Sequence, residues 1–298
     1  MPSSNDLVVC CLDGSAESLR AARVALTLID RSRYRVALAS VVPDFDAAYI
    51  TGIDPIVPVT AGAESVELVQ ERQQQVADLL AHAAAELGLP DAQQLVLAGP
   101  PGPILREYAR EEHPALLVTG ARGLDESDRP GVGEVPDYLV RKAPCPVLVV
   151  RADAVENDEG PVLVCTDGSE HAHHAAVSVI PLLPAEIAVQ IVTVAAKAPP
   201  AKPHETGYDM MTDRKWEGEE DAILTDISTA VDRPDATHTV LTGPPVDTLL
   251  DAATGAPARA MVIGSKGHGA LARAVLGSVA HQILGEATCP VFVAGPRS

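Results

Sequence analysis

Aromatic side chains are scarce in this sequence: phenylalanine, tyrosine and tryptophan make up 3% of its 298 residues, and there is one tryptophan. Hydrophobic residues nevertheless amount to 47%, so alanine, valine and leucine must fill the core. This combination is typical of buried parallel strands that are covered by alanine-rich helices. We therefore expect an α/β protein with long apolar strands rather than a core built around aromatic rings.

Positive charge is also in short supply. The chain has 22 Lys and Arg residues against 41 Asp and Glu residues, which gives a formal net charge of −19. Binding to the phosphates of nucleic acids, or to anionic lipid headgroups, depends on an excess of Lys and Arg. The composition argues against both, and we expect neither a nucleic acid nor a membrane among the partners.

Long apolar runs are missing as well. No uninterrupted apolar stretch reaches the roughly 20 residues that a membrane-spanning helix needs. The polar residues 1–6 are not followed by the apolar core and cleavage site of a secretory signal. The five cysteines have neither the spacing of a zinc site nor a CxxC pair, so we interpret them as buried, reduced thiols. These features predict a cytoplasmic protein.

What the sequence does contain is an internal repeat. The apolar run and Asp-Gly-Ser of residues 7–15 return at 161–169. Three further landmarks return in the same order: Gly-Pro-Pro at 99–101 and 243–245, the glycines Gly120, Gly123 and Gly133 as Gly264, Gly267 and Gly277, and Cys-Pro-Val at 145–147 and 289–291. The chain is therefore predicted to have two domains of one kind, residues 1–152 and 160–298, joined by an acidic linker at 153–159.

Strand and helix patterns alternate within each copy. Such alternation predicts a parallel sheet of five strands, flanked by helices on both faces and joined by right-handed crossovers. In the second copy we expect strands at 162–165, 187–194, 237–241, 260–263 and 290–294, and helices at 169–183, 219–231, 246–253 and 271–284. In the first copy we expect further strands at 34–42, 94–97, 115–119 and 146–150, and helices at 15–29, 64–87, 104–110 and 136–142.

Ligands of doubly wound sheets bind beyond the carboxyl ends of the strands, where the strand order reverses. Three segments of the second copy are expected to converge there. They are the turn after the first strand with Thr166 and Asp167, the end of the second strand with Val194, and the loop after the fourth strand.

That loop carries Gly264, Lys266 and Gly267, and nine residues later Gly277 and Ser278. Glycines allow the backbone to approach a polyanion, and consecutive N–H groups can point at phosphate oxygens. A helix must begin near Gly277 if its N–H groups and the Ser278 hydroxyl are to reach a phosphate. His268, Lys266 and Arg273 add local positive charge.

At these residues the sequence resembles the universal stress protein family. The ATP-binding members carry G-x2-G-x9-G-[S/T], which Gly264, Gly267, Gly277 and Ser278 match, and they place an Asp after the first strand, as in Asp167 and Asp13. The resemblance covers nearly the whole chain, twice. It implies two flavodoxin-like (Rossmann-like) α/β domains and ATP as ligand, with Mg²⁺ left open.

The family also suggests roles for the residues of the second copy. It implies that Asp167 lies near adenine and ribose, Val194 lies against the base, and the glycines with Ser278 hold ribose and phosphates. Thr166, Lys266 and Val279 complete the predicted ATP site. Tandem members pair their halves through the last strands, so we expect an intramolecular pseudo-dimer and a homodimer of chains.

The first copy carries a weaker version of this site, with Asp13, Val41, Gly120, Gly123 and Gly133. Here Glu134 replaces the Ser/Thr of the pattern, and the intervening loop has Asp125, Glu126 and Asp128 against Arg129 alone. A carboxylate close to a phosphate would repel it, whereas a carboxylate turned to solvent or bridged by a cation would not. We predict a weak or empty first site.

Other interpretations carry less weight. Residues 267–272 match the dinucleotide pattern G-x-G-x-x-A, but they follow the fourth strand rather than the first, and no P-loop occurs. His171, His173 and His174 could bind a metal, although an exposed helix face is the simpler interpretation. Trp216 lies in a long loop and fits either a nucleotide cover or an interface.

We therefore expect an ATP-binding regulatory protein of the stress response that is not an enzyme. The sequence offers no general base placed beside a phosphate, no Walker-type lysine and no cluster of carboxylates for two metals. Slow ATP hydrolysis and a scaffold that binds no nucleotide stay open as alternatives. In the scaffold alternative the glycines form bare turns at strand ends.

Overall fold

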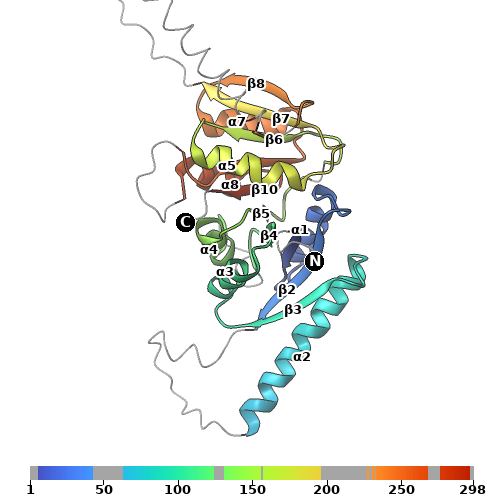
Figure 1. Ribbon diagram of the computed structural model, residues 1–298. Helices are drawn as coiled ribbons and strands as arrows, with labels where there is room; N and C mark the ends of the chain where they lie inside the picture. The colour runs from blue at the N-terminus through green and yellow to red at the C-terminus, as the bar shows by residue number, and fades with distance from the viewer. Residues whose placement is uncertain are drawn as a thin grey trace, which may run out of the picture. The chain divides into compact units, whose positions relative to one another are not determined.

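The computed structural model divides the chain into two compact units, Met1–Ala152 and Asp153–Ser298 (Figure 1). It describes residues 6–42, 63–123, 131–155, 157–195, 227, 230–231, 233–267 and 276–295. Several predictions fall outside these residues: most of the helix at 219–231, and Asp125, Glu126, Asp128, Arg129, Trp216, His268 and Arg273.

The first unit is a doubly wound parallel sheet. Its strands are β1 (Leu7–Cys11), β2 (Arg35–Val42), β3 (Gln93–Ala98), β4 (Leu116–Gly120) and β5 (Val147–Val150). Its helices are α1 (Ala16–Leu28), α2 (Ala63–Glu86), α3 (Pro101–Glu112) and α4 (Glu134–Lys142). The spatial order is β3-β2-β1-β4-β5 and every pair within it is parallel, so the strand order reverses between β1 and β4.

The second unit repeats this topology. Its strands are β6 (Val162–Thr166), β7 (Val189–Ala195), β8 (Thr237–Thr242), β9 (Ala260–Gly264) and β10 (Val291–Ala294). Its helices include α5 (Glu170–Val179), α7 (Pro245–Gly255) and α8 (Ser278–Glu286). The order β8-β7-β6-β9-β10 is again all parallel, and Val162 of β6 pairs with Val189 on one side and with Ala260 on the other. The predicted fold class is confirmed.

Burial follows the position of each strand in its sheet. The central strands β1, β4 and β6 are buried along their whole length, because helices cover both faces. The outer strands β3 and β8 alternate between exposed and half-buried residues. Alanines let the helices pack closely on these strands, since they are buried in α1 and α5 alike: Ala21, Ala22 and Ala25, and Ala172, Ala175 and Ala176.

The first helix of each unit begins at a serine that follows a glycine turn. Gly14 and Gly168 have φ of 89° and 77°, a backbone conformation that favours glycine. Ser15 and Ser169 then accept a hydrogen bond from the backbone N–H three residues later, which caps α1 and α5. The turn that holds Asp13 or Asp167 is therefore fixed at both ends.

The predicted helix at 271–284 is wrong at its start, because Leu276 and Gly277 are not helical and α8 begins at Ser278. Gly277 has an extended conformation (φ −63°, ψ 150°), and its N–H donates to the Ser265 carbonyl at 2.9 Å. This tie to the preceding loop holds Gly277 outside the helix. Apolar periodicity gives no sign of such a contact.

The predicted linker packs on the second unit where it is described. Ala154 is buried, and the N–H of Val155 donates to the Thr288 carbonyl at 2.6 Å. Asp158 forms an ion pair with Arg259 at 3.3 Å. These contacts place the described part of 153–158 with the second unit.

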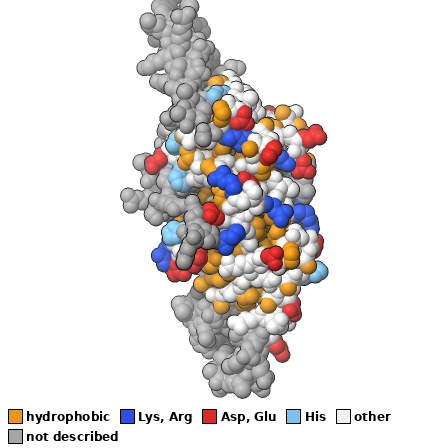
Figure 2. Space-filling view, turned by 45° about the vertical axis from the view of Figure 1, so that its right-hand side comes forward, with side chains coloured by type: hydrophobic (Ala, Val, Ile, Leu, Met, Phe, Trp, Pro, Cys, Tyr) orange, Lys and Arg blue, Asp and Glu red, His pale blue; other side chains and the backbone are white. Residues whose placement is uncertain are grey.

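On the face drawn in Figure 2, acidic and basic side chains are interspersed over the described residues, without one continuous field of either sign. Exposed ion pairs contribute to this mixture, for example Arg110 with Glu107 and Arg23 with Glu86. Within the described ranges, no helix has both the length and the apolar character that crossing a bilayer requires.

Candidate functional site

The turn after β6 forms one wall of the candidate site. The Thr166 hydroxyl accepts the Gly168 N–H at 3.1 Å, and the Asp167 carboxylate accepts the Ser169 N–H at 3.0 Å. Both bonds reach two residues along the chain, which is how Asp and Thr side chains stabilise tight turns. They fix the Asp167 carboxylate at the carboxyl end of β6, beside the place where the strand order reverses.

The loop after β9 lies against this turn. A Cβ atom on Gly267 would be 2.5 Å from the Asp167 Oδ2 atom, so the backbone of residue 267 directly faces the carboxylate. The Ser169 hydroxyl donates to the Lys266 carbonyl at 3.4 Å. The structure thus brings together Asp167, Lys266 and Gly267, which the sequence predicted to share a site.

Gly264 has a different reason to be glycine. A Cβ atom at this position would be 2.7 Å from the Ala172 backbone nitrogen and 2.9 Å from the His171 carbonyl carbon, both in α5. In the first unit a Cβ on Gly120 would be 3.1 Å from the Glu17 Cγ and 3.3 Å from its carbonyl carbon. The first glycine of the pattern lets a helix approach the fourth strand, independently of any ligand.

The start of α8 forms the opposite wall. A Cβ on Gly277 would be 3.3 Å from the Lys266 Cα, so the helix start packs on the loop. The N–H of Gly277 already donates to Ser265, whereas Ser278 and Val279 stand in the first turn, where backbone N–H groups have no partner within the helix. Gly277, at the N-cap position, has no side chain that could cap this helix, and no acidic residue lies in its first turn. Such a helix start favours an anion.

The two predicted valines of the base pocket lie near the carboxyl ends of their strands. Val194 of β7 is half-buried and pairs with Leu241 of β8, and Val41 of β2 is half-buried and pairs with Leu97 of β3. Val279 has an exposed fraction of 36%, which is high for a large apolar side chain.

Sequence reasoning missed His171, which it assigned to an exposed helix face. Its side chain is half-buried, and its Nδ1 atom lies 2.9 Å from the Ser265 Oγ in the loop after β9. Burial lowers the pKa of His171, and the nearby Lys266 cation lowers it further. His171 lies two residues after Ser169, which caps α5. This position at the start of the helix is the sequence signal that could have indicated a contact with the loop.

The first unit has the same Asp turn and the same glycine contacts as the second. The Asp13 carboxylate accepts the Ser15 N–H at 2.9 Å and the Ser15 hydroxyl at 2.6 Å. A Cβ on Gly123 would be 2.9 Å from Asp13 Oδ2, and the Gly133 N–H donates to the Ala121 carbonyl at 2.8 Å. Partial burial raises the pKa of Asp13, but hydrogen bonds from Ser15 and Ser18 outweigh it and leave the pKa below its ordinary value.

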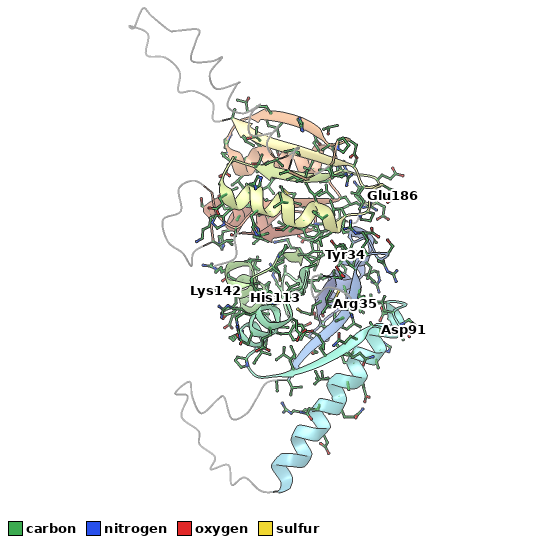
Figure 3. The ribbon with its side chains drawn as sticks, in the orientation of Figure 1. Tyr34, Arg35, Asp91, His113, Lys142 and Glu186 are labelled. Atoms are coloured by element: carbon green, nitrogen blue, oxygen red, sulfur yellow. The ribbon has the colours of Figure 1, made fainter. Side chains whose placement is uncertain are left out.

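The start of α4 differs from the start of α8 in charge. Glu134 and Asp137 both lie in its first turn, and Arg141 and Lys142 in its last turn, where Figure 3 labels Lys142. The chain itself therefore supplies the negative charge that a helix start favours. Glu134 is exposed to solvent, where its charge is screened, and Asp137 pairs with Arg141 at 2.9 Å.

A second carboxylate in the first unit was missed by the sequence analysis. The Glu17 Oε1 atom accepts the backbone N–H of Arg122 at 3.0 Å, and Arg122 stands in the loop between Gly120 and Gly123. The Arg122 side chain in turn donates to the Gly131 carbonyl at 3.1 Å. Nothing in the glycine pattern indicates this contact, because Glu17 lies in a helix far along the chain.

Fold and site together define a class: doubly wound α/β domains whose glycine-containing loop and helix start meet at the switch point of the sheet. The universal stress protein family model matches residues 5–151 and residues 160–295. The chain belongs to the universal stress protein family and carries its domain twice, which confirms the family assignment made from the glycine pattern.

Individual relatives agree with this. Proteins from several Staphylococcus aureus strains that carry the universal stress protein name, strain USA300 among them, are 34% identical over 84 residues. That match covers 28% of this chain, and the chain spans about half the length of these relatives, 51%. Two solved structures share the fold across nearly the whole chain.

The first is a universal stress protein from Archaeoglobus fulgidus, with a TM-score of 0.65, 19% identity and 99% of both chains covered. The second is a protein from Pseudomonas aeruginosa UCBPP-PA14 that carries the same family name. It has a TM-score of 0.57 and 14% identity, and the match covers 98% of this chain and 94% of that one.

Proposed function

We propose that this member of the universal stress protein family is a regulatory protein that binds one ATP per chain, in its second unit. The observation that carries the proposal is the contact between the start of α8 at Gly277 and the backbone of Lys266 and Gly267, which faces the Asp167 carboxylate. Two elements with donors for phosphate oxygens thus converge beside a carboxylate that can accept from ribose hydroxyls.

The residues fit the chemistry of a nucleotide. Ser278 and Val279 offer backbone N–H groups at a helix start without acidic residues, and the backbone of the basic residue Lys266 packs against Gly277, just before them. Val194 offers apolar surface to a base. Bound ATP would supply negative charge to the helix start, and Mg²⁺ is included in the proposal as a companion of the phosphates.

The proposed mode of action is binding rather than turnover. Nucleotide occupancy would change the conformation of the loop after β9, or the affinity for a partner protein. We place the protein in the cytoplasm, which suits five buried free cysteines. We also keep the pseudo-dimer of halves as part of the proposal, together with a homodimer of chains, whose mass light scattering would test.

Nucleotide analysis of the purified, heat-denatured chain tests the proposal. ATP or ADP at about one per chain supports it, whereas a chain that neither retains nor rebinds nucleotide favours a scaffold without a ligand. Incubation with saturating Mg²⁺ and ATP then separates a binder from a hydrolase, because a binder releases no phosphate above the buffer blank.

A charge placed at the helix start locates the site. Ser278→Glu puts a carboxylate at the first residue of α8, and we expect ATP affinity to fall by about tenfold, or roughly 1.4 kcal/mol. Gln282→Glu is the matched control, since it adds the same charge to an exposed position one turn further along α8. Equal affinity in the two variants would place the ligand elsewhere.

A further inference from the structure

Glu17 and His171 occupy equivalent positions in the two units, since each lies two residues after the serine that caps its helix. Both side chains face the loop after the fourth strand of their own unit. Glu17 accepts the Arg122 N–H at 3.0 Å, whereas the His171 Nδ1 lies 2.9 Å from Ser265 Oγ. The helix and the loop correspond in the two units, but a carboxylate contacts the loop in the first unit and an imidazole contacts it in the second.

The Glu17 side chain lies close to the backbone at the end of β4. Its Cγ would be 3.1 Å from a Cβ on Gly120, which is tighter than most contacts of that kind. Partial burial raises the pKa of Glu17 above its ordinary value, because it outweighs the backbone hydrogen bonds at Arg122 and Ala121 and the charges of Arg122 and Arg151, which act in the opposite direction. The carboxylate therefore uses a backbone donor and positive charges that a phosphate at this loop would need.

The second unit lacks such a carboxylate at this position. His171 has a pKa below its ordinary value, so it is neutral at pH 7 and brings no negative charge to the loop. Lys266, the counterpart of Arg122, follows Ser265 in this loop. Glu134 is a weaker candidate for the difference between the units, since its side chain is exposed.

We propose that Glu17 is an internal ligand of the loop between Gly120 and Gly123 and keeps nucleoside triphosphates out of the first unit. His171 brings no carboxylate to the corresponding place in the second unit and so does not repel them there. Residue 17, rather than residue 134, then determines which half of the chain takes the nucleotide. This inference rests on the proposed function, because it explains why one of two similar sites would be used.

Titration calorimetry of the full chain with ATP and Mg²⁺ tests the inference through its stoichiometry. We expect one ATP per chain for the wild type and for Glu134→Ser, and two for Glu17→His, both alone and combined with Glu134→Ser. In the reciprocal variant, His171→Glu, affinity for the single ATP should fall by about 100-fold. Glu71→His is the matched control for Glu17→His, because it makes the same change of charge at an exposed position in α2. The Glu71→His chain should still bind one ATP.

The outcomes separate the inference from the function on which it rests. A wild-type chain that binds no ATP refutes the proposed function and the inference together. A wild type that binds one ATP and a double variant that also binds only one refutes the inference alone. A second ATP gained by Glu134→Ser without any change at residue 17 also refutes it, as does a wild type that binds two.

A measurement without nucleotide tests the contact itself and shows whether the variants fold. In a ¹H–¹⁵N correlation spectrum, the Arg122 amide signal should shift as the Glu17 carboxylate titrates, and Glu17→Gln should abolish that shift while the rest of the spectrum is preserved. An Arg122 amide that is indifferent to this titration would overturn the proposal, because the carboxylate would not occupy the loop in solution.

Discussion

The Oδ2 atom of Asp167 lies 2.5 Å from the point where a side chain on Gly267 would begin. The carboxylate at the end of β6 therefore occupies the space that a side chain at residue 267, after β9, would need. The two residues are far apart in the sequence. The same relationship recurs between Asp13 and Gly123, at 2.9 Å. The pairing of an Asp turn with the second glycine is thus built into both units.

Gly267→Ala tests this relationship. The new methyl group would displace the Asp167 carboxylate, which is the end of a side chain and can move, so we expect little loss of stability. ATP affinity should fall by about tenfold, as Asp167 leaves its place. Gly255→Ala is the control, because a Cβ there meets nothing within 4 Å. Unchanged ATP affinity in Gly267→Ala would remove Asp167 from the site.

Gly264→Ala, in contrast to Gly267→Ala, should lower the stability of the chain. Its methyl group would meet the Ala172 backbone nitrogen at 2.7 Å, and a helix backbone cannot yield as a side chain does. We expect the free energy of unfolding to fall by about 1–3 kcal/mol, measured by urea denaturation. Gly285→Ala in α8 has open space at its Cβ and should be neutral or stabilising. Wild-type stability of Gly264→Ala would contradict the packing role.

The stability of the second unit should decrease on mild acidification through His171. Burial first, and then the charge of Lys266, lower the pKa of His171 in the folded chain below its unfolded value. As the pH falls below about 6.5, the unfolded chain binds a proton there that the folded chain resists, so stability is lost. His171→Asn should lose less stability than the wild type between pH 7.5 and 5.5 in urea titrations. Parallel curves would show that His171 does not contribute.

The cysteines should be inert in the folded chain. All five are free and buried, and burial raises the pKa of Cys10 and of Cys289 to about 12. Because the thiolate is the reactive form, an aromatic disulfide reagent at pH 8 should modify none of them until the protein is unfolded. Rapid reaction of a single thiol without denaturant would show that its strand opens locally.

Much of the fold could be predicted from the sequence, because its signals are local. Apolar runs such as 162–165, the capping serines and the repeated landmarks are visible along the chain, and they suffice for the doubly wound class. Apolar periodicity placed the start of α8 too early, because the hydrogen bond from the Gly277 N–H to the Ser265 carbonyl accompanies an extended Gly277 outside the helix. That bond joins two segments whose proximity no periodicity reveals.

For the candidate site, the sequence indicated which residues would lie near one another but not all of their contacts. Asp167 and Gly267 were expected together and lie together, whereas Gly264 was interpreted as a place of ligand approach and packs on a helix. Glu17 and His171 were missed, since their importance comes from a side chain that crosses from one helix to a distant loop. Pairings of this kind depend on tertiary structure.

The packing of helices on Gly120 and Gly264 also bears on how such domains diverge after duplication. Even without a ligand, a larger residue at the first glycine would press on the helix above it, more severely at Gly264, where a Cβ would be 2.7 Å from the helix backbone, than at Gly120, where it would be 3.3 Å from it. Selection for folding alone is then enough to preserve part of a motif that began as a binding signature. The glycines alone then do not show that a copy binds a ligand, and the residues around them have to be considered as well.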